Sequence, residues 1–210
     1  MTNTSKTTNS MVKGALLLAL AFVLTYLEFA IIPGNTWLKL DFSAVPILVA
    51  GLAFGPTFGL LLTGLLQVLV IAIQGTTTGG VGQIANLIMV GSFVFVASFM
   101  YKRNKTTTGL IIGLVLGTIT LIVAGFLANK FILLPLYIKA FFGGAFPGGD
   151  VAYNAYLYQM VPLFNLIKGV VLSVISGVVY SRLGSFLNKE AWKYEHMTGS
   201  KKTNNSFVTR

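Results

Sequence analysis

Long apolar stretches separated by short polar segments dominate this sequence. The continuous apolar runs predict helices at Val12 to Ile32, Gly82 to Tyr101, Thr108 to Leu134 and Met160 to Leu183. A hydrocarbon core about 30 Å thick needs roughly 18 or more apolar residues with few charges in each helix that crosses it. All four runs meet this requirement, so each is predicted to span a membrane.

The apolar run from Phe42 to Gln74 is longer than one span requires. As a single helix it would reach about 50 Å, well beyond the thickness of the hydrocarbon core. Gly55-Pro56 interrupts it, and proline is tolerated at the first position of a helix because its missing N–H has no partner there anyway. We therefore predict a short helix at Ser43 to Phe54 and a full one at Pro56 to Gln74, which makes six spans.

The distribution of charge supports this split. The chain has 15 Lys and Arg against 5 Asp and Glu. Eleven of the cations fall in three segments: residues 6–13, the loop at 102–105, and residues 182–210. Cations flank spans on the cytoplasmic side, and six spans place all three segments there, with Lys39, Lys130 and Lys139 at the outer face. The sequence thus predicts an all-α membrane protein, a six-transmembrane-helix bundle with both termini cytoplasmic.

The two ends of the chain are rich in Ser, Thr and Asn. We predict a disordered N-terminal tail over residues 1–10, a six-helix transmembrane domain over 11–188 and a cytoplasmic polar C-terminal tail over 189–210. The net charge of +10 is interpreted as anchoring rather than nucleic-acid binding, because the cations flank apolar runs. The absence of Cys excludes disulfides and Cys metal sites.

Small residues recur at every fourth position on three of the predicted helices. They are Gly109, Gly113 and Gly117, then Gly169, Ser173, Gly177 and Ser181, and finally Ala15 and Ala19. Such spacing lets helix backbones approach closely in lipid. Internal packing is the favoured interpretation for the first two sets. For Ala15 and Ala19, a docking surface for another subunit is an equal alternative.

Four polar side chains fall inside predicted spans: Asn86, Asn129, Asn165 and Lys168. An unpaired lysine within a span costs about 2.5–3.5 kcal/mol on insertion scales. Each Asn could instead bond a neighbouring helix, and Lys168 could extend outward along its stem. Because the topology places all four in the outer half of the bilayer, we predict a cavity that opens outward. No acidic partner for Lys168 is expected inside the bundle; Glu28, near the outer end of the first predicted helix, is a candidate partner, with simple hydration as the alternative.

Several catalytic motifs are missing. The glycine-rich segment GTTTGGVG at residues 75–82 lacks the Lys-Ser/Thr ending of a P-loop. The only histidine, His196, falls in the predicted tail, and no carboxylate pair lies within the spans. We therefore predict that the chain is not an enzyme.

Four segments together resemble the riboflavin-binding S component (the substrate-binding subunit) of energy-coupling factor (ECF) vitamin transporters. They are LKLDFSAVP at 38–46, GTTTGGVGQIAN at 75–86, NKFILLPLY at 129–137 and PLFNLIKG at 162–169. The resemblance implies a six-helix fold with a vitamin pocket facing outward and riboflavin or FMN as the transported ligand, with residues 40–42 closing over it. The binding residues it implies are Leu40, Asp41, Phe42, Gly82, Asn86, Asn129, Tyr137, Asn165 and Lys168.

The resemblance also implies partners. In the family a transmembrane coupling subunit and two cytoplasmic ATPase subunits supply the energy from ATP, and the pattern at Ala15 and Ala19 docks the coupling subunit. No cofactor of the chain itself and no nucleic acid is expected. Ala44 and TGLLQ at 63–67 depart from the family pattern and leave the head-group preference open. Two alternatives remain: an S component for another vitamin, and a self-sufficient secondary transporter, which Gly55-Pro56 keeps open.

Overall fold

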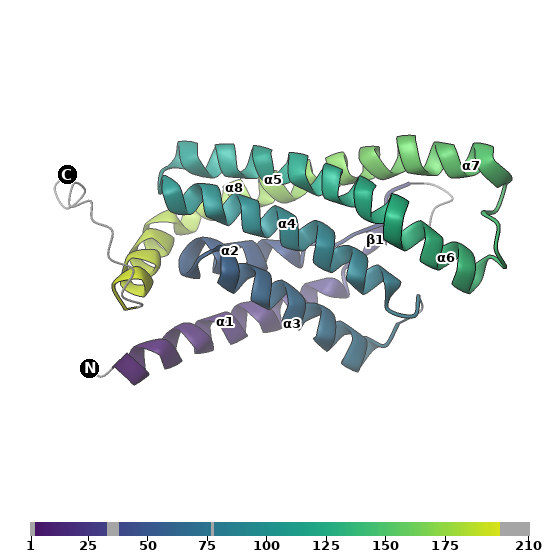
Figure 1. The fold of residues 1–210 in the computed structure, drawn as a ribbon. Coiled ribbons are helices and arrows are strands. Elements are labelled where there is room, and N and C mark those ends of the chain that lie inside the picture. The colour runs from purple at the N-terminus through teal and green to yellow at the C-terminus, as the bar shows by residue number, and fades with distance from the viewer. Residues whose placement is uncertain (1–2, 33–37, 77, 198–210) are drawn as a thin grey trace.

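Six helical rods form the bundle in the computed structural model of the chain (Figure 1), which describes residues 3–32, 38–76 and 78–197, with the side chains of residues 8, 10–32, 38–76 and 78–182. In chain order the elements are α1 (Asn3–Thr25), β1 (Phe29–Ala30), β2 (Lys39–Leu40), α2 (Ala44–Phe54), α3 (Pro56–Gln74), α4 (Val81–Arg103), α5 (Thr107–Ala128), η1 (Asn129–Leu133), α6 (Leu134–Phe141), α7 (Gly149–Ala155), η2 (Tyr156–Met160) and α8 (Val161–Met197). Four rods are long and apolar enough to cross a membrane, and the apolar stretches 10–25 and 44–54 are shorter.

The predicted break at Gly55-Pro56 is confirmed. Gly55 has a φ of 104°, a left-handed conformation that suits glycine, and Pro56 occupies the first turn of α3. The short helix α2 is buried along nearly its whole length, because it packs against α1, α3, α4 and α8. An apolar helix without a polar face is expected in such a position.

The prediction for the first helix was wrong at both ends. α1 ends at Thr25 rather than Ile32, and Phe29–Ala30 instead pairs antiparallel with Lys39–Leu40. This pairing gives the backbone N–H and C=O groups of the two strands the hydrogen-bond partners that a helix would otherwise supply. The ring centres of Phe29 and Phe42 lie 6.0 Å apart. We call residues 28–32 and 38–43 the strap, because they cross the bundle between α1 and α2. Pairing between two strands of only two residues each leaves no periodic signal within either segment.

The two longest rods also extend past their predicted ends. The predicted fifth helix continues through η1 and α6 to Phe141, and the predicted sixth begins at Gly149. Each contains a π-helical turn shortly before a proline: Leu134 N–H donates to Asn129 O ahead of Pro135, and Val161 N–H to Tyr156 O ahead of Pro162.

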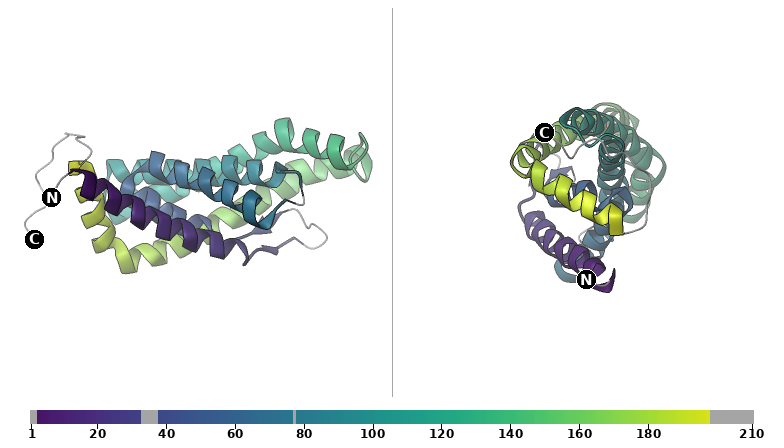
Figure 2. Two further views of the ribbon diagram at one scale, coloured as in Figure 1. Left: turned by 90° about the horizontal axis from the view of Figure 1, so that it is seen from below. Right: turned by 90° about the vertical axis from the view of Figure 1, so that its left-hand side faces the viewer.

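A proline normally ends or kinks a helix, because its ring clashes with the carbonyl four residues earlier. The wider π turn is a recognised way of accommodating an irregularity inside a helix, and here both helices continue beyond their prolines. As a result α6 and α7 project past the rest of the bundle (Figures 1 and 2).

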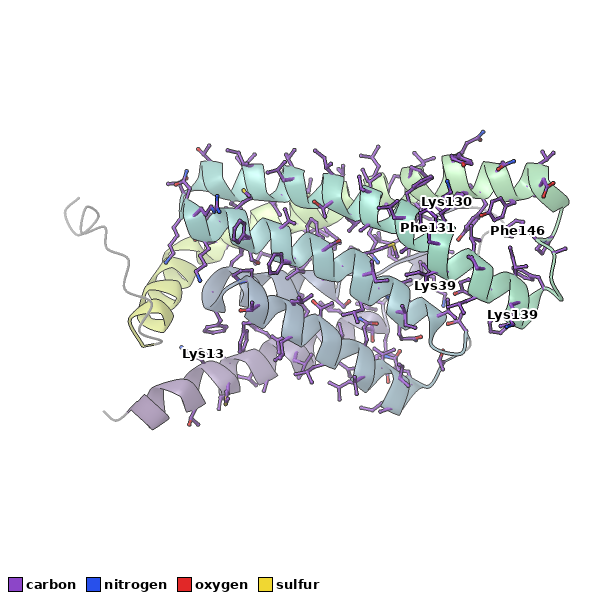
Figure 3. All side chains as sticks on the ribbon, viewed as in Figure 1. Lys13, Lys39, Lys130, Phe131, Lys139 and Phe146 are labelled. Atoms are coloured by element: carbon purple, nitrogen blue, oxygen red, sulfur yellow. The ribbon has the colours of Figure 1, made fainter. Side chains whose placement is uncertain are left out.

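Both ends of the described chain lie at the same end of the bundle (Figures 1 and 2). The last turn of α4, which carries Lys102 and Arg103, and the following loop with Lys105 lie at this end as well. Lys39, Lys130 and Lys139 lie toward the other end from Lys13 (Figure 3). The segregation of charge along the bundle therefore matches the sequence pattern. Which end faces the cytoplasm stays a prediction.

Parts of the predicted tails are helical. α1 begins at Asn3, within the segment 1–10 that we expected to be disordered, and α8 continues to Met197, within the expected tail 189–210. No Gly or Pro interrupts residues 3–13 or 185–197, so each adjoining helix has no local reason to stop. Residues 198–210 lie outside the described residues.

Only some of the small residues at fourth positions lie at close helix contacts. On α5, a Cβ at Gly113 would lie 2.7 Å from the carbonyl oxygen of Ala97 on α4. On α8, a Cβ at Gly169 would lie 2.5 Å from Thr118 Cγ2, whereas one at Gly177 would meet nothing within 4 Å. Ala15 and Ala19 are exposed on α1. Close packing thus uses α5 and the first half of α8, and leaves the alanines on α1 available at the surface.

Candidate functional site

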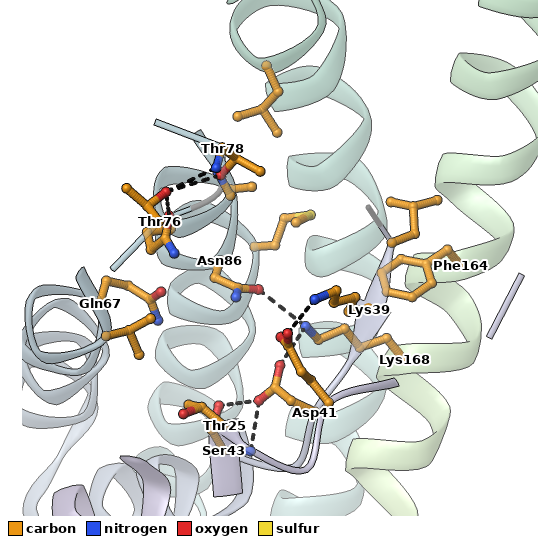
Figure 4. Close-up of a pocket in the computed structure, with 18 of the residues that line it drawn as sticks. Thr25, Lys39, Asp41, Ser43, Gln67, Thr76, Thr78, Asn86, Phe164 and Lys168 are labelled. Atoms are coloured by element: carbon orange, nitrogen blue, oxygen red, sulfur yellow. Dashed lines mark hydrogen bonds and ion pairs between the residues drawn. The ribbon is translucent and has the colours of Figure 1, made fainter. Parts of the chain in front are cut away.

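A cavity of about 580 Å³ lies between the strap, α3, α4 and the π-turn regions of the two longest rods (Figure 4). Its size falls within the range of about 300–1,000 Å³ typical of small-molecule sites. The described residues that line it are Thr25, Glu28, Leu38, Lys39, Asp41, Ser43, Gln67, Val70, Gln74, Gly75, Thr76, Thr78, Gly82, Gln83, Ala85, Asn86, Met89, Asn129, Leu133, Tyr137, Tyr156, Phe164 and Lys168. Polar and apolar side chains therefore share one enclosed surface.

Lys168 forms the charged centre of this cavity. Its side chain is only 1% exposed, and its Nζ lies 3.4 Å from Asp41 Oδ2 and 3.3 Å from Asn86 Oδ1. Figure 4 shows the three side chains converging from α8, the strap and α4. A buried lysine needs such partners, because an ion removed from water without compensation is strongly destabilising.

The acid that pairs with Lys168 comes from the strap and not from a helix. Our expectation that Glu28 is a candidate partner was wrong, because Glu28 pairs with Lys39 at the cavity mouth. Asp41 accepts hydrogen bonds from the backbone N–H of Ser43, at 2.9 Å, and from the Ser43 hydroxyl. These bonds direct one carboxylate oxygen toward Ser43 and leave the other for Lys168.

The electrostatics of Asp41 follow from the same contacts. Burial by itself raises the pKa of this carboxyl, but the Lys168 ammonium and the hydrogen bonds from Ser43 outweigh burial and hold the pKa below its usual value. Asp41 is therefore ionised at neutral pH. The strap and α8 are joined by an ion pair inside the bundle.

The π turns bring further side chains to the cavity. Asn129 and Leu133 belong to η1 and Tyr156 to η2, and all three line the cavity. The Asn129 side-chain N–H donates to Gly125 O at 2.8 Å, which fixes the orientation of its amide group. Irregular helical turns occur often at functional sites, and here both lie beside the same cavity.

The loop between α3 and α4 closes the polar end of the cavity. Thr76 Oγ1 accepts hydrogen bonds from the backbone N–H groups of Thr78 and Gly80, and Thr78 Oγ1 accepts one from the N–H of Gly82. Gly80 adopts a left-handed conformation, with φ 89°, which lets the chain turn into α4. Two threonine hydroxyls thus organise the start of α4.

The structure brings together six of the nine predicted binding residues. Asp41, Gly82, Asn86, Asn129, Tyr137 and Lys168 line the cavity. Leu40, Phe42 and Asn165 do not: Leu40 is buried in the strap, and Phe42 packs on Phe29. Asn165 is 1% exposed and donates to Val161 O, while its Oδ1 has no partner among the described residues.

Several lining residues were missed by sequence reasoning. They are polar groups of α1, the strap, α3 and the α3–α4 segment, namely Thr25, Ser43, Gln67, Gln74, Thr76, Thr78 and Gln83. Gln67 carries a usable signal, because a glutamine within an apolar span is costly unless it faces a polar site. The others lie near helix ends, where polar residues are common. Among the described residues, no group of three His, Cys, Asp or Glu could hold a metal ion.

Comparison with known proteins identifies the architecture. Residues 9–180 match the family model of the ECF transporter substrate-specific component. The chain belongs to this family. A solved S component of a bacterial ECF transporter superimposes with a TM-score of 0.72 at 33% identity, covering 86% of this chain and 98% of that one. The resemblance carried by the four sequence segments is therefore confirmed.

Curated relatives of this S component are transporters. The riboflavin transporter RibU of Streptococcus thermophilus is 37% identical, covering 90% of this chain and 87% of that protein. RibU of Staphylococcus aureus is 37% identical, covering 83% and 90%, and the riboflavin transporter FmnP of Bacillus subtilis is 31% identical, covering 87% and 95%. The chain is thus a multi-pass S component of a bacterial cell membrane, and its relatives are transporters rather than enzymes.

Proposed function

We propose that this chain captures riboflavin at the outer face of the membrane and presents it to a coupling subunit driven by two ATPase subunits. One observation carries the proposal: a cavity of drug-like size with a buried Lys168–Asp41–Asn86 centre, in a chain whose relatives are named riboflavin transporters. In this proposal the end of the bundle that holds the cavity faces outward, and both termini are cytoplasmic.

The chemistry of the cavity suits a flavin ring. The pyrimidine edge of the isoalloxazine alternates carbonyl acceptors with an N–H donor, and the amides of Asn86 and Asn129 offer both roles. Lys168 can donate to a carbonyl or ring nitrogen while it stays paired with Asp41. The dimethylbenzene end needs apolar walls, which are supplied by Met89, Leu133 and Phe164 among others.

The ribityl chain suits the polar end of the same cavity. Its hydroxyl groups both donate and accept, as do the side chains of Thr76, Thr78 and Gln83 around the α3–α4 loop. We propose that the ribityl chain extends toward this loop and toward the strap. Its terminal hydroxyl then lies nearest the mouth, which holds Glu28 and Lys39.

Purified protein tests the proposal directly. Detergent-solubilised full-length chain from cells grown with riboflavin is expected to show flavin absorbance. After removal of the ligand it is expected to quench riboflavin fluorescence at submicromolar to micromolar concentration. Thiamine and biotin serve as matched vitamin controls. A colourless preparation that does not bind riboflavin but is stabilised by another vitamin would contradict the proposal. That vitamin would then be the proposed ligand.

The surface of α1 is proposed as the docking site for the coupling subunit. Ala15 and Ala19 are exposed one turn apart, and small residues at this spacing allow close helix contact. The double substitution Ala15→Trp, Ala19→Trp is expected to abolish co-purification with the coupling subunit and its ATPases while riboflavin binding by the isolated chain is retained. Ala140→Trp, at an exposed alanine on α6, is the control. Unchanged co-purification of the double variant would exclude this face of α1.

A further inference from the structure

We infer that Glu28 is a specificity-determining residue, which makes the cavity favour an uncharged flavin over its phosphate ester. This inference rests on the proposed function and adds to it the choice between riboflavin and FMN. Both ligands share the ring, so the difference between them lies at the end of the ribityl chain. The relevant part of the site is therefore the mouth and not the Lys168 centre.

The charged groups of the cavity balance one another. Among the described lining residues the acids and bases are Glu28, Asp41, Lys39 and Lys168. They form two ion pairs, Glu28 with Lys39 and Asp41 with Lys168. The undescribed internal segments, residues 33–37 and 77, contain no ionisable side chain. The cavity wall therefore presents no surplus cation to an anionic ligand.

The pairing of strands places Glu28 beside Lys39. Glu28 directly precedes β1, in which Ala30 pairs with Lys39 and Phe29 with Leu40. The two charged side chains are each 45% exposed, so an incoming phosphate reaches both of them. An exposed pair contributes only about 0–1 kcal/mol to stability, which makes its effect on ligand choice separable from folding.

Most of the N–H groups at the start of α4 are also occupied by other partners. The start of α4 would ordinarily attract an anion through its free N–H groups. Here the N–H groups of Thr78, Gly80 and Gly82 are bonded to threonine hydroxyls, and that of Val81 to Thr78 O.

The two other lysines of this end do not line the cavity. They are Lys130, whose Nζ lies 6.0 Å and 5.5 Å from the ring centres of Phe126 and Phe131, and Lys139 on α6 (Figure 3). The phosphate of FMN therefore has Lys39 as its nearest cationic group in the cavity wall.

The consequence for FMN is repulsion. A phosphate monoester carries about −1.5 to −2 charges at pH 7, and at the mouth it meets Glu28 together with Lys39. To bind, it must take Lys39 away from Glu28 and leave two anions close together. Without the Glu28 carboxylate, the same Lys39 is free to make a charge-assisted bond to the phosphate.

Paired titrations of the ligand-free, full-length chain with riboflavin and FMN test this inference. For the unmodified chain we expect a Kd for FMN about tenfold or more above that for riboflavin. In Glu28→Gln the ratio of the two Kd values is expected to fall by about 2- to 5-fold, an amount typical of one exposed charge pair. The added affinity for FMN should weaken with increasing salt, because the new contact is exposed.

Two matched variants separate this contact from general electrostatics. Asp150→Asn removes one carboxylate from α7, at a residue that does not line the cavity, and is expected to leave the Kd ratio unchanged. Adding Lys39→Gln to Glu28→Gln removes the cation that the phosphate would use and is expected to raise the ratio again. Equal Kd values for the two flavins in the unmodified chain, or an unchanged ratio in Glu28→Gln, would overturn the inference while the proposed function stands. Failure to bind either flavin would overturn both.

Discussion

Replacing Lys168 with methionine is expected to weaken riboflavin binding by about 10- to 100-fold. Lys168 is buried at the centre of the cavity with Asp41 and Asn86 around it. Methionine preserves much of the apolar stem but removes the donor, and one charge-assisted hydrogen bond is worth about 1.5–3 kcal/mol. The measurement is the Kd from fluorescence quenching. Lys130→Met, which removes a cation outside the cavity wall, is the control.

The stability of the same variants tests whether Asp41 and Lys168 act as a pair. Lys168→Met leaves a buried carboxylate without its cation, and Asp41→Asn leaves a buried ammonium without its anion. Each single substitution is therefore expected to lower Tm in detergent, and the double variant is expected to lower it by less than the sum of the two single losses. The double variant should recover part of the loss, with a coupling energy of about 1–3 kcal/mol. Strictly additive losses would show that the two groups do not interact.

Replacing Gly113 with leucine is expected to destabilise the bundle by about 3 kcal/mol, which corresponds to a fall in Tm of roughly 6–12 °C. A Cβ at this position would lie 2.7 Å from the carbonyl oxygen of Ala97 and 3.3 Å from Met100 Cβ. The backbone of α4 cannot move aside by a change of rotamer. α4 and α5 would have to separate along their most extensive contact.

Gly177→Leu is the matched control for this prediction. It makes the same chemical change in a helix, but a Cβ at Gly177 meets nothing within 4 Å. Because leucine has a higher helix propensity than glycine, by somewhat under 1 kcal/mol, this variant should be as stable as the unmodified chain or slightly more so. A similar loss in both variants would show that close approach of α4 and α5 does not explain the effect.

Two features of the fold were predictable because their physical cause is local. Hydrocarbon thickness limits the length of a span, and Gly55-Pro56 marks a break in the long second apolar run. Desolvation cost likewise singled out Asn86, Asn129 and Lys168, all of which line the cavity. A polar group within an apolar span is expensive wherever the span lies in the bundle, so its significance is visible before the fold is known.

Other features depend on contacts between distant residues. A proline normally ends or kinks a helix, yet two π turns carry both helices onward past Pro135 and Pro162. Asn165 satisfies the same cost argument as the other polar residues, but its side chain bonds within α8 and does not reach the cavity. In each case the local rule is sound, and a particular backbone geometry changes its outcome.

The sequence by itself determined that this chain is a six-helix membrane bundle with cations gathered toward one end and a polar layer toward the other. The length of an apolar run, a glycine-proline break and the desolvation cost of a polar residue each depend on one segment of the chain. They can therefore be recognised from that segment alone. Only the tertiary structure decided that Asp41 is the counterion of Lys168 and that Glu28 pairs with Lys39. The reason is physical: the two partners in the first pair are 127 positions apart, and a strand pairing that no local pattern specifies brings the strap across the bundle.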